Sequence, residues 1–344
     1  MNILSIDVED YFMVTALEQA VKRSEWHRYE SRVERNTHRL LEILENTQLP
    51  SSSANFVGTG ARHPLNATFF CLGWVAERFP GLIREIHARG HEIACHGYAH
   101  RRIHPMFPRA FRQDIRRAKA LLEDCSGEQV IGYRAPSYSV TPKNLWALDV
   151  LAEEGFLYDS SVFPVRHDLY GFPDAPRSPS LVVKGDGGVR FMPMNSNTAP
   201  TSRRESYGAE PATPLLVEFP PSTIRLFGQN LPVAGGGYFR FFPLSFTKWA
   251  VNRIRKNDLP LIFYLHPWEI DSAQPRVRGL SLKSSFRHYL NLHKTENRLK
   301  SLLRMVTFSS FRDFMIEQKM LDPNSMPTIQ RRKEGTWNDA GLER

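Results

Sequence analysis

Three carboxylates lie within four residues near the N-terminus, in the segment Asp7-Val8-Glu9-Asp10. They directly follow an apolar run at residues 3–6, which is typical of a buried strand. Carboxylates this close together repel one another unless a cation or a proton compensates their charge. The cluster is therefore a candidate cation site, and the alternative is a turn whose acids cap a helix.

Two histidines four residues apart, His96 and His100, follow another apolar run at residues 92–95. Side chains at this spacing converge where the backbone turns helically, and imidazole is a common ligand of zinc. The pair alone is a weak signal, because a solvated turn has the same pattern. Together with the acid cluster, which also follows a strand, it favours a metal site. Cys95 is a poor further ligand because neighbouring strand residues face opposite ways.

Two more polar side chains end apolar runs. Arg134 follows residues 130–133, where its guanidinium could pair with a buried carboxylate or remain on the surface before a turn. His266 follows residues 261–265 and precedes Pro, Trp and Glu. A lone histidine near a core is usually a satisfied polar group, but at the end of a barrel strand it is a candidate general acid.

These residues need strands and helices that bring them together, and the apolar pattern supplies both. The expected strands cover residues 3–6, 67–72, 92–95, 130–133, 215–219 and 261–265. The expected helices cover residues 37–44, 80–88, 110–122, 143–154 and 246–254. This alternation predicts an α/β fold with a mostly parallel sheet, open or closed into a barrel. Such folds gather their chemistry at the carboxyl ends of the strands, where the polar residues above lie.

Other segments interrupt the alternation. Residues 51–64 are rich in Ser, Gly, Asn and His, and indicate a surface loop. Residues 174–214 predict a long irregular insertion. We expect a barrel domain at residues 1–271 that carries this insertion, a helical extension at 272–321 packed on the barrel, and a disordered tail at 322–344.

Composition narrows the function classes. The 344 residues carry 45 Lys and Arg against 36 Asp and Glu, a formal net charge of +9. These basic residues are spread along expected helices without a nucleic-acid-binding signature, so nucleic acid is not an expected partner. Three scattered cysteines are too few to stabilise a fold through disulfide bonds, and they indicate a reducing compartment. With neither a signal peptide nor an apolar span of about 18 residues, we expect a cytoplasmic protein without a membrane span.

In the types and order of its motifs, the chain resembles the polysaccharide deacetylase family, the NodB-homology group of carbohydrate esterase family 4. The resemblance rests on the acid cluster, Ala67-Thr68-Phe69-Phe70, Gly90-His91-Glu92-Ile93, Arg134-Ala135-Pro136 and Leu265-His266. The chain is similar above all to a branch associated with exopolysaccharide and exosortase systems, through residues 7–12, 160–164, 230–240, 266–271 and 286–291.

The resemblance implies a distorted (β/α)7 barrel with a C-terminal extension, and a hydrolase that removes N-acetyl groups from an amino-sugar polysaccharide. Asp7 matches the base that would deprotonate a metal-bound water. Arg134 matches the arginine that pairs with this base, and His266 matches the acid that protonates the departing amine. The implied partners are an acetylated polysaccharide or oligosaccharide and other proteins of exopolysaccharide biosynthesis.

The same resemblance implies a divalent metal, Zn2+ or alternatively Co2+. His96 and His100 match its two histidine ligands. The common family pattern has adjacent aspartates, whereas Val8 follows the base here, so Glu9 is the expected third ligand and Asp10 the alternative.

Four other side chains near the motifs are candidates for substrate binding: Ser137, Tyr138, Asp159 and Trp268. A backbone N–H near Ser137 would be a suitable oxyanion donor.

Two competing functions keep the same fold. One is a metal-independent, allantoinase-like hydrolase of C–N bonds in a small molecule, and the other is a glycan-binding protein without catalysis. The acid and histidine set argues against the first, and the presence of Asp7 and His266 argues against the second.

Overall fold

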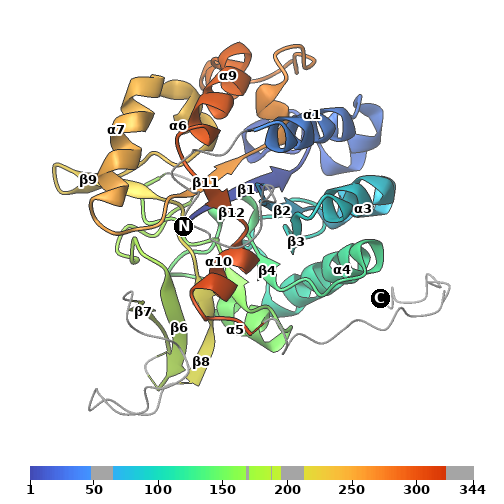
Figure 1. The fold of residues 1–344 in the computed structure, drawn as a ribbon. Helices are drawn as coiled ribbons and strands as arrows, with labels where there is room; N and C mark the ends of the chain where they lie inside the picture. The colour runs from blue at the N-terminus through green and yellow to red at the C-terminus, as the bar shows by residue number, and fades with distance from the viewer. Residues whose placement is uncertain (48–64, 168–169, 187, 195–212, 323–344) are drawn as a thin grey trace, which may run out of the picture.

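The computed structural model describes residues 1–47, 65–167, 170–186, 188–194 and 213–322. Within these residues, parallel strands form the centre of the fold in the spatial order β11-β1-β2-β3-β4-β5-β8 (Figure 1). Their bounds are β1 Asn2–Val8, β2 Thr68–Cys71, β3 Glu92–Cys95, β4 Gly132–Tyr133, β5 Tyr158–Asp159, β8 Thr213–Glu218 and β11 Ile262–Leu265. The predicted α/β class with a parallel sheet is confirmed.

The two outer parallel strands, β8 and β11, approach each other through the residues that follow β8. Ser222 N donates to the carbonyl of Ile262 at 3.2 Å, and Ile262 N donates to Ser222 Oγ at 2.9 Å. Gly235 forms a parallel bridge with Tyr264, and a Cβ at Gly235 would lie 1.9 Å from the Tyr264 carbonyl oxygen. These contacts connect the two outer strands, β8 and β11, which do not pair with each other directly. The parallel strands therefore curve toward a closed barrel.

Helices follow the strands and cover the outside of the sheet (Figure 1). They are α1 Val33–Glu45, α2 Gly73–Arg78, α3 Pro80–Ala88, α4 Pro108–Ser126, α5 Trp146–Glu153 and α7 Leu244–Arg255. In α4, Phe111, Ile115, Ala118 and Leu122 are buried at three- and four-residue steps, which is the apolar stripe of a helix packed on a core. The helix ends where Gly127 adopts φ 76°, a left-handed conformation that favours glycine.

The expectation of an irregular insertion at residues 174–214 is wrong where the structure describes it. Strands β6 Ser180–Gly185 and β7 Gly188–Pro193 form an antiparallel hairpin, and β6 also pairs with β8. The surrounding Pro, Ser and Gly residues favoured a loop over a strand, but β6 forms because it pairs with β7 on one side and β8 on the other. A second hairpin, β9 Thr223–Leu226 with β10 Gln229–Pro232, was also not expected. The expected loop at 51–64 lies outside the described residues.

The C-terminal part of the described chain is mainly helical. It contains α8 Leu282–Tyr289, α9 Leu292–Leu303, β12 Phe308–Ser309 and α10 Phe311–Glu317. Strand β12 pairs with β1, so this part contributes to the central sheet. Phe311 N donates to Thr68 Oγ1 at the start of β2, which places α10 at the amino ends of the strands. The boundary at residue 271 stays a prediction, as does the tail, which beyond Asp322 lies outside the described residues.

Within the described ranges, no helix combines the length and the apolar character that crossing a membrane requires.

Candidate active site

Glu9, His96 and His100 converge at the carboxyl ends of β1 and β3. Each offers one donor atom, these atoms lie within 4.8 Å of one another, and all three residues are buried. Glu9 Oε2 is 2.9 Å from His100 Nε2, a separation that requires a shared proton or a cation between the two atoms. One carboxylate and two imidazoles form a donor set that suits zinc and similar divalent ions. The residues present therefore fit the implied metal.

The protonation of these groups also suits metal binding. His96 Nδ1 lies 2.8 Å from the carbonyl oxygen of Arg134, which fixes the ring and leaves Nε2 free to act as a ligand. Burial lowers the pKa of His96 to about 4, so its imidazole is neutral at neutral pH. Burial alone would raise the pKa of Glu9, but the charge of His100 and its hydrogen bond lower it to about 2. A neutral imidazole and an ionised carboxylate are the forms that bind a metal.

Asp10, the alternative ligand, points to a different partner. Its Oδ2 accepts hydrogen bonds from Ser31 Oγ at 2.7 Å, Arg32 N at 2.8 Å and Val33 N at 3.2 Å. The carboxylate therefore caps the amino end of α1, where unpaired N–H groups favour a negative charge. Burial raises the pKa of Asp10 to about 6 despite these hydrogen bonds. The structure thus brings Glu9, and not Asp10, to the two histidines.

Asp7 forms a buried ion pair with Arg134. Arg134 Nη1 lies 2.6 Å from Asp7 Oδ1 and 2.8 Å from Ser5 Oγ. The other guanidinium nitrogens donate to Ser160, Nε to its carbonyl at 3.2 Å and Nη2 to its hydroxyl at 2.9 Å. Burial alone would lower the pKa of Arg134, but the Asp7 carboxylate raises it. This pairing holds the Asp7 carboxylate in one orientation.

His266 faces the same carboxylates from the end of β11. Its Nε2 is 3.8 Å from Asp7 Oδ2 and 3.5 Å from Glu9 Oε1. On its other side, Nδ1 is 2.7 Å from Glu269 Oε1. Burial alone would lower the pKa of His266, but the hydrogen bond to Glu269 and the charge of Glu9 raise it to about 9. The ring is therefore protonated at neutral pH and can donate a proton from Nε2.

Three of the four candidate substrate residues lie beside this site. Ser137 and Tyr138 have φ 56° and 51°, two successive left-handed residues directly after the Arg134 segment. The Tyr138 ring packs 5.5 Å from the Arg134 guanidinium, and its buried hydroxyl has no hydrogen-bond partner. Trp268 stacks on His266 with ring centroids 5.3 Å apart. Ser137, which is half-buried, is the most accessible of the three.

The fourth candidate, Asp159, does not fit substrate binding. It is fully buried, and its carboxylate accepts a hydrogen bond from Ser161 Oγ at 2.5 Å. It also contacts Glu218, and burial raises the pKa of both acids, that of Asp159 to about 6. Strand β5, which ends at Asp159, lies inside the sheet between β4 and β8.

Sequence reasoning missed two residues of the site, Glu269 and Arg240. Glu269 had a signal, because an acid three residues after the start of a helical turn is the pattern of a capping box, and the structure shows that arrangement with His266. Arg240 lies in a glycine-rich segment that carries no comparable signal.

Two family models match separate parts of the chain. Residues 49–153 match polysaccharide deacetylase, and residues 191–316 match a domain of unknown function, DUF3473. His96, His100 and Arg134 lie in the first match and His266 in the second.

The curated relatives that match part of the chain are also named as deacetylases. A peptidoglycan deacetylase-like protein of Gibberella zeae is 33% identical over 110 residues, 31% of this chain and 32% of that protein. A peptidoglycan-N-acetylglucosamine deacetylase of Bacillus cereus is 30% identical over 89 residues, 26% of this chain and 32% of that protein. The matched segment thus spans about a third of each relative. A solved structure from Mycobacterium smegmatis, assigned to the polysaccharide deacetylases, shares the fold with TM-score 0.52, 18% identity and coverage of 97% of this chain and 95% of that one.

Proposed function

Because the chain carries a polysaccharide deacetylase domain of the NodB-homology family, we propose that it is a metal-dependent hydrolase of N-acetyl groups on an amino-sugar polysaccharide. The observation that carries this proposal is the convergence of three potential metal ligands, Glu9, His96 and His100, with a base candidate and an acid candidate at one end of the sheet. We further propose that the polysaccharide is an exopolysaccharide and that the protein acts in the cytoplasm with other proteins of its biosynthesis.

An amide is a poor electrophile, so its hydrolysis needs help with both the attack and the departure of the amine. A divalent ion such as Zn2+ or Co2+, held by Glu9, His96 and His100, would polarise the amide carbonyl and lower the pKa of water. The protein groups around the trio then only have to move protons and hold the substrate.

Asp7 and His266 are suited to the two proton transfers. Arg134 binds Asp7 Oδ1 at 2.6 Å, which leaves Oδ2 to accept a proton from the attacking water. As the C–N bond breaks, Nε2 of His266 donates its proton to the departing nitrogen. The products are acetate and a protonated amine on the sugar, because the acetic acid formed passes its proton to the amine. Both catalytic residues recover their starting states when the proton held by Asp7 returns to His266 through solvent.

We propose that Ser137, Tyr138 and Trp268 form the walls of the substrate site. Trp268 also donates from Nε1 to Glu9 Oε1 at 3.4 Å, so it connects the acid candidate with the metal-binding carboxylate. The Tyr138 hydroxyl is buried without a partner, which leaves it able to bind a sugar oxygen.

The two competing functions make different demands on these residues. A metal-independent hydrolase of a small molecule needs no converging trio, so Glu9, His96 and His100 would be expected to pair with protein groups. A glycan-binding protein without catalysis needs no buried base held by an arginine and no protonated histidine opposite it. The described geometry favours the metal-dependent hydrolase over both.

The first test is the metal content of the purified protein, compared with His96→Ala and with a matched control, His91→Ala. His91 is also a buried histidine, but it lies at the start of β3, where its Nδ1 accepts a hydrogen bond from Ala67 N. We expect about one divalent ion per chain in the wild type and in His91→Ala, and none in His96→Ala. Deacetylation of acetylated oligosaccharides should stop with a chelator and return with Zn2+ or Co2+. Full activity of the metal-free protein would contradict the proposal.

A further inference from the structure

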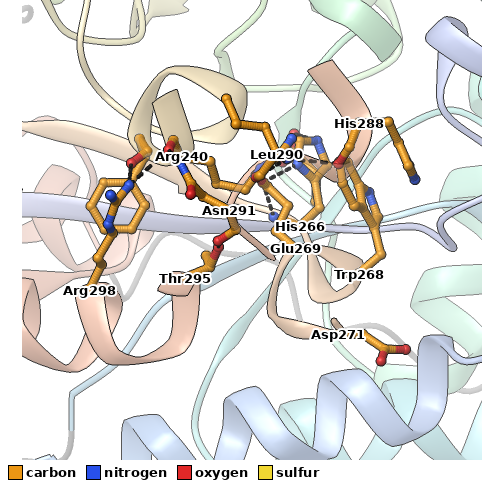
Figure 2. A network of polar contacts seen from close by, with 12 residues as sticks. Arg240, His266, Trp268, Glu269, Asp271, His288, Leu290, Asn291, Thr295 and Arg298 are labelled. Atoms are coloured by element: carbon orange, nitrogen blue, oxygen red, sulfur yellow. Dashed lines mark hydrogen bonds and ion pairs between the residues drawn. The ribbon is translucent and has the colours of Figure 1, made fainter. Parts of the chain in front are cut away.

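His266 is held by a buried ion pair whose two members come from distant parts of the chain (Figure 2). Glu269 Oε1 lies 2.7 Å from His266 Nδ1, and Arg240 Nε donates to Glu269 Oε2 at 2.6 Å. Arg240 is 2% exposed and Glu269 is fully buried. Buried ion pairs contribute little net stability, because the cost of removing both charges from water offsets their attraction. The pair therefore calls for an explanation other than stability.

The C-terminal helices fix Arg240 itself. Arg240 lies in α6 Gly236–Phe241, and its Nη1 donates to the carbonyls of His288 at 2.8 Å and Leu290 at 3.0 Å, at the end of α8. In return, Asn291 Nδ2 donates to the Arg240 carbonyl at 2.9 Å. Arg298 of α9 donates to the same carbonyl and to two others of this segment. The carbonyls of His288 and Leu290 thus hold the Arg240 guanidinium, whereas Asn291 and Arg298 hold the backbone of this segment.

Stacking fixes the plane of the His266 ring. Trp268 lies between His266 and His288, with centroid separations of 5.3 Å and 4.4 Å and interplanar angles of 26° and 16°. His288 Nε2 is in turn 2.8 Å from Gln274 Oε1. The stack restricts rotation of the His266 ring out of its plane, whereas Glu269 determines which ring nitrogen faces the carboxylates.

We propose that Arg240 is a positioning residue that acts through Glu269 to fix the orientation of the His266 ring. The region matched by the domain of unknown function, residues 191–316, thereby completes the active site. It contributes His266 and the residues that hold it, whereas the polysaccharide deacetylase match contributes His96, His100 and Arg134. The inference rests on the proposed function, because that function gives His266 its role as the acid.

The test compares Arg240→Met with a matched control, Arg298→Met. Both arginines bind backbone carbonyls in the same network, but only Arg240 contacts Glu269. We expect both variants to keep their bound metal. Arg240→Met should lower kcat roughly 10- to 100-fold with KM little changed, by analogy with the loss of an outer-shell partner from a metal-binding histidine. Arg298→Met should lower Tm but keep kcat.

Arg240→Met leaves the Glu269 carboxylate buried without its cation, so this variant could fold poorly. A second variant and a second measurement keep the proposal testable in that case. Arg240→Lys keeps a positive charge beside Glu269, and we expect it to fold and to recover part of the lost kcat. In 15N-histidine-labelled protein, the hydrogen-bonded Nδ1 proton of His266 should give a downfield resonance, assigned by its loss in His266→Gln. This resonance should persist in Arg298→Met and be lost or shifted in Arg240→Met.

Wild-type kcat in folded Arg240→Met, or an equal loss of kcat in Arg298→Met, would overturn the proposal. If the wild type deacetylates no acetylated glycan, the proposed function fails, but the resonance still tests the positioning. Its loss in Arg240→Met alone would support the role of Arg240, and its persistence in both variants would refute that role.

Discussion

Asp7 and His266 face each other across the end of the sheet, with Oδ2 of the carboxylate 3.8 Å from Nε2 of the imidazole. Each has a separate buried partner on its far side, Arg134 for Asp7 and Glu269 for His266. Despite burial, the hydrogen bond to Glu269 and the charge of Glu9 raise the pKa of His266, whereas the ion pair with Arg134 orients the Asp7 carboxylate. A base and an acid placed this way can serve the two halves of one hydrolysis.

Asp7→Asn should remove the base while leaving the metal in place, because Asp7 is not among the three converging donors. The amide oxygen can still accept a hydrogen bond from Arg134, so we expect a folded protein. Loss of a general base should reduce kcat by roughly 10²- to 10⁴-fold. Deacetylation kinetics and metal analysis of the same preparation check this, and a variant with near-wild-type kcat would show that Asp7 has another role.

Glu9→Ala and Asp10→Ala should have separable effects although the two residues are adjacent. Glu9→Ala should empty the metal site, since it removes one of three donors. Asp10→Ala should keep the metal and lower the free energy of unfolding by roughly 0.5–2 kcal/mol, the usual cost of losing a helix cap. Elemental analysis and denaturant unfolding measure the two effects. Loss of metal in Asp10→Ala at unchanged stability would reverse the assignment.

The buried acids Asp159 and Glu218 should make stability depend on pH. Burial raises the pKa of both, that of Asp159 to about 6, whereas unfolded carboxyl groups titrate near pH 4. The folded protein thus retains a proton that the unfolded chain releases. Their contribution is fully present below about pH 4 and is lost as pH rises through the folded values.

Glu218→Gln should flatten this dependence, because its amide can donate to Asp159 without a shared proton while its oxygen still accepts from Val162 N. Unfolding midpoints between pH 4 and 8 would measure the change against Glu317→Gln, an exposed control. Parallel profiles for the wild type and Glu218→Gln would exclude the shared proton.

Gly235→Ala should be strongly destabilising, by several kcal/mol, because the added Cβ would meet the Tyr264 backbone and φ is 130°. Gly228→Ala is the matched control. Gly228 also has a positive φ, 76°, but a Cβ there meets nothing within 4 Å, so only the conformational cost of about 1–2 kcal/mol applies. Similar unfolding free energies for both variants would contradict the close approach of Gly235 to β11.

The sequence predicted the features that depend on neighbouring residues. Alternating apolar runs and helical periodicity give the α/β class, because side-chain direction follows backbone geometry within a few residues. This prediction of fold class is confirmed. The order of the polar motifs likewise indicated a resemblance to the polysaccharide deacetylases, and residues 49–153 match the model of that family. The roles of Asp7, Arg134 and His266 stay predictions, although the structure brings these three side chains together.

Tertiary structure decided what depends on residues far apart in the chain. The sequence pattern favoured Glu9 as the third ligand and left Asp10 as the alternative, and only the fold places the amino end of α1 where it binds the Asp10 carboxylate. Arg240 has no local signal, because its partner Glu269 is brought to it by the fold. Periodicity reports how residues within one turn or one strand are arranged, whereas which distant side chains share a buried site depends on how the elements pack.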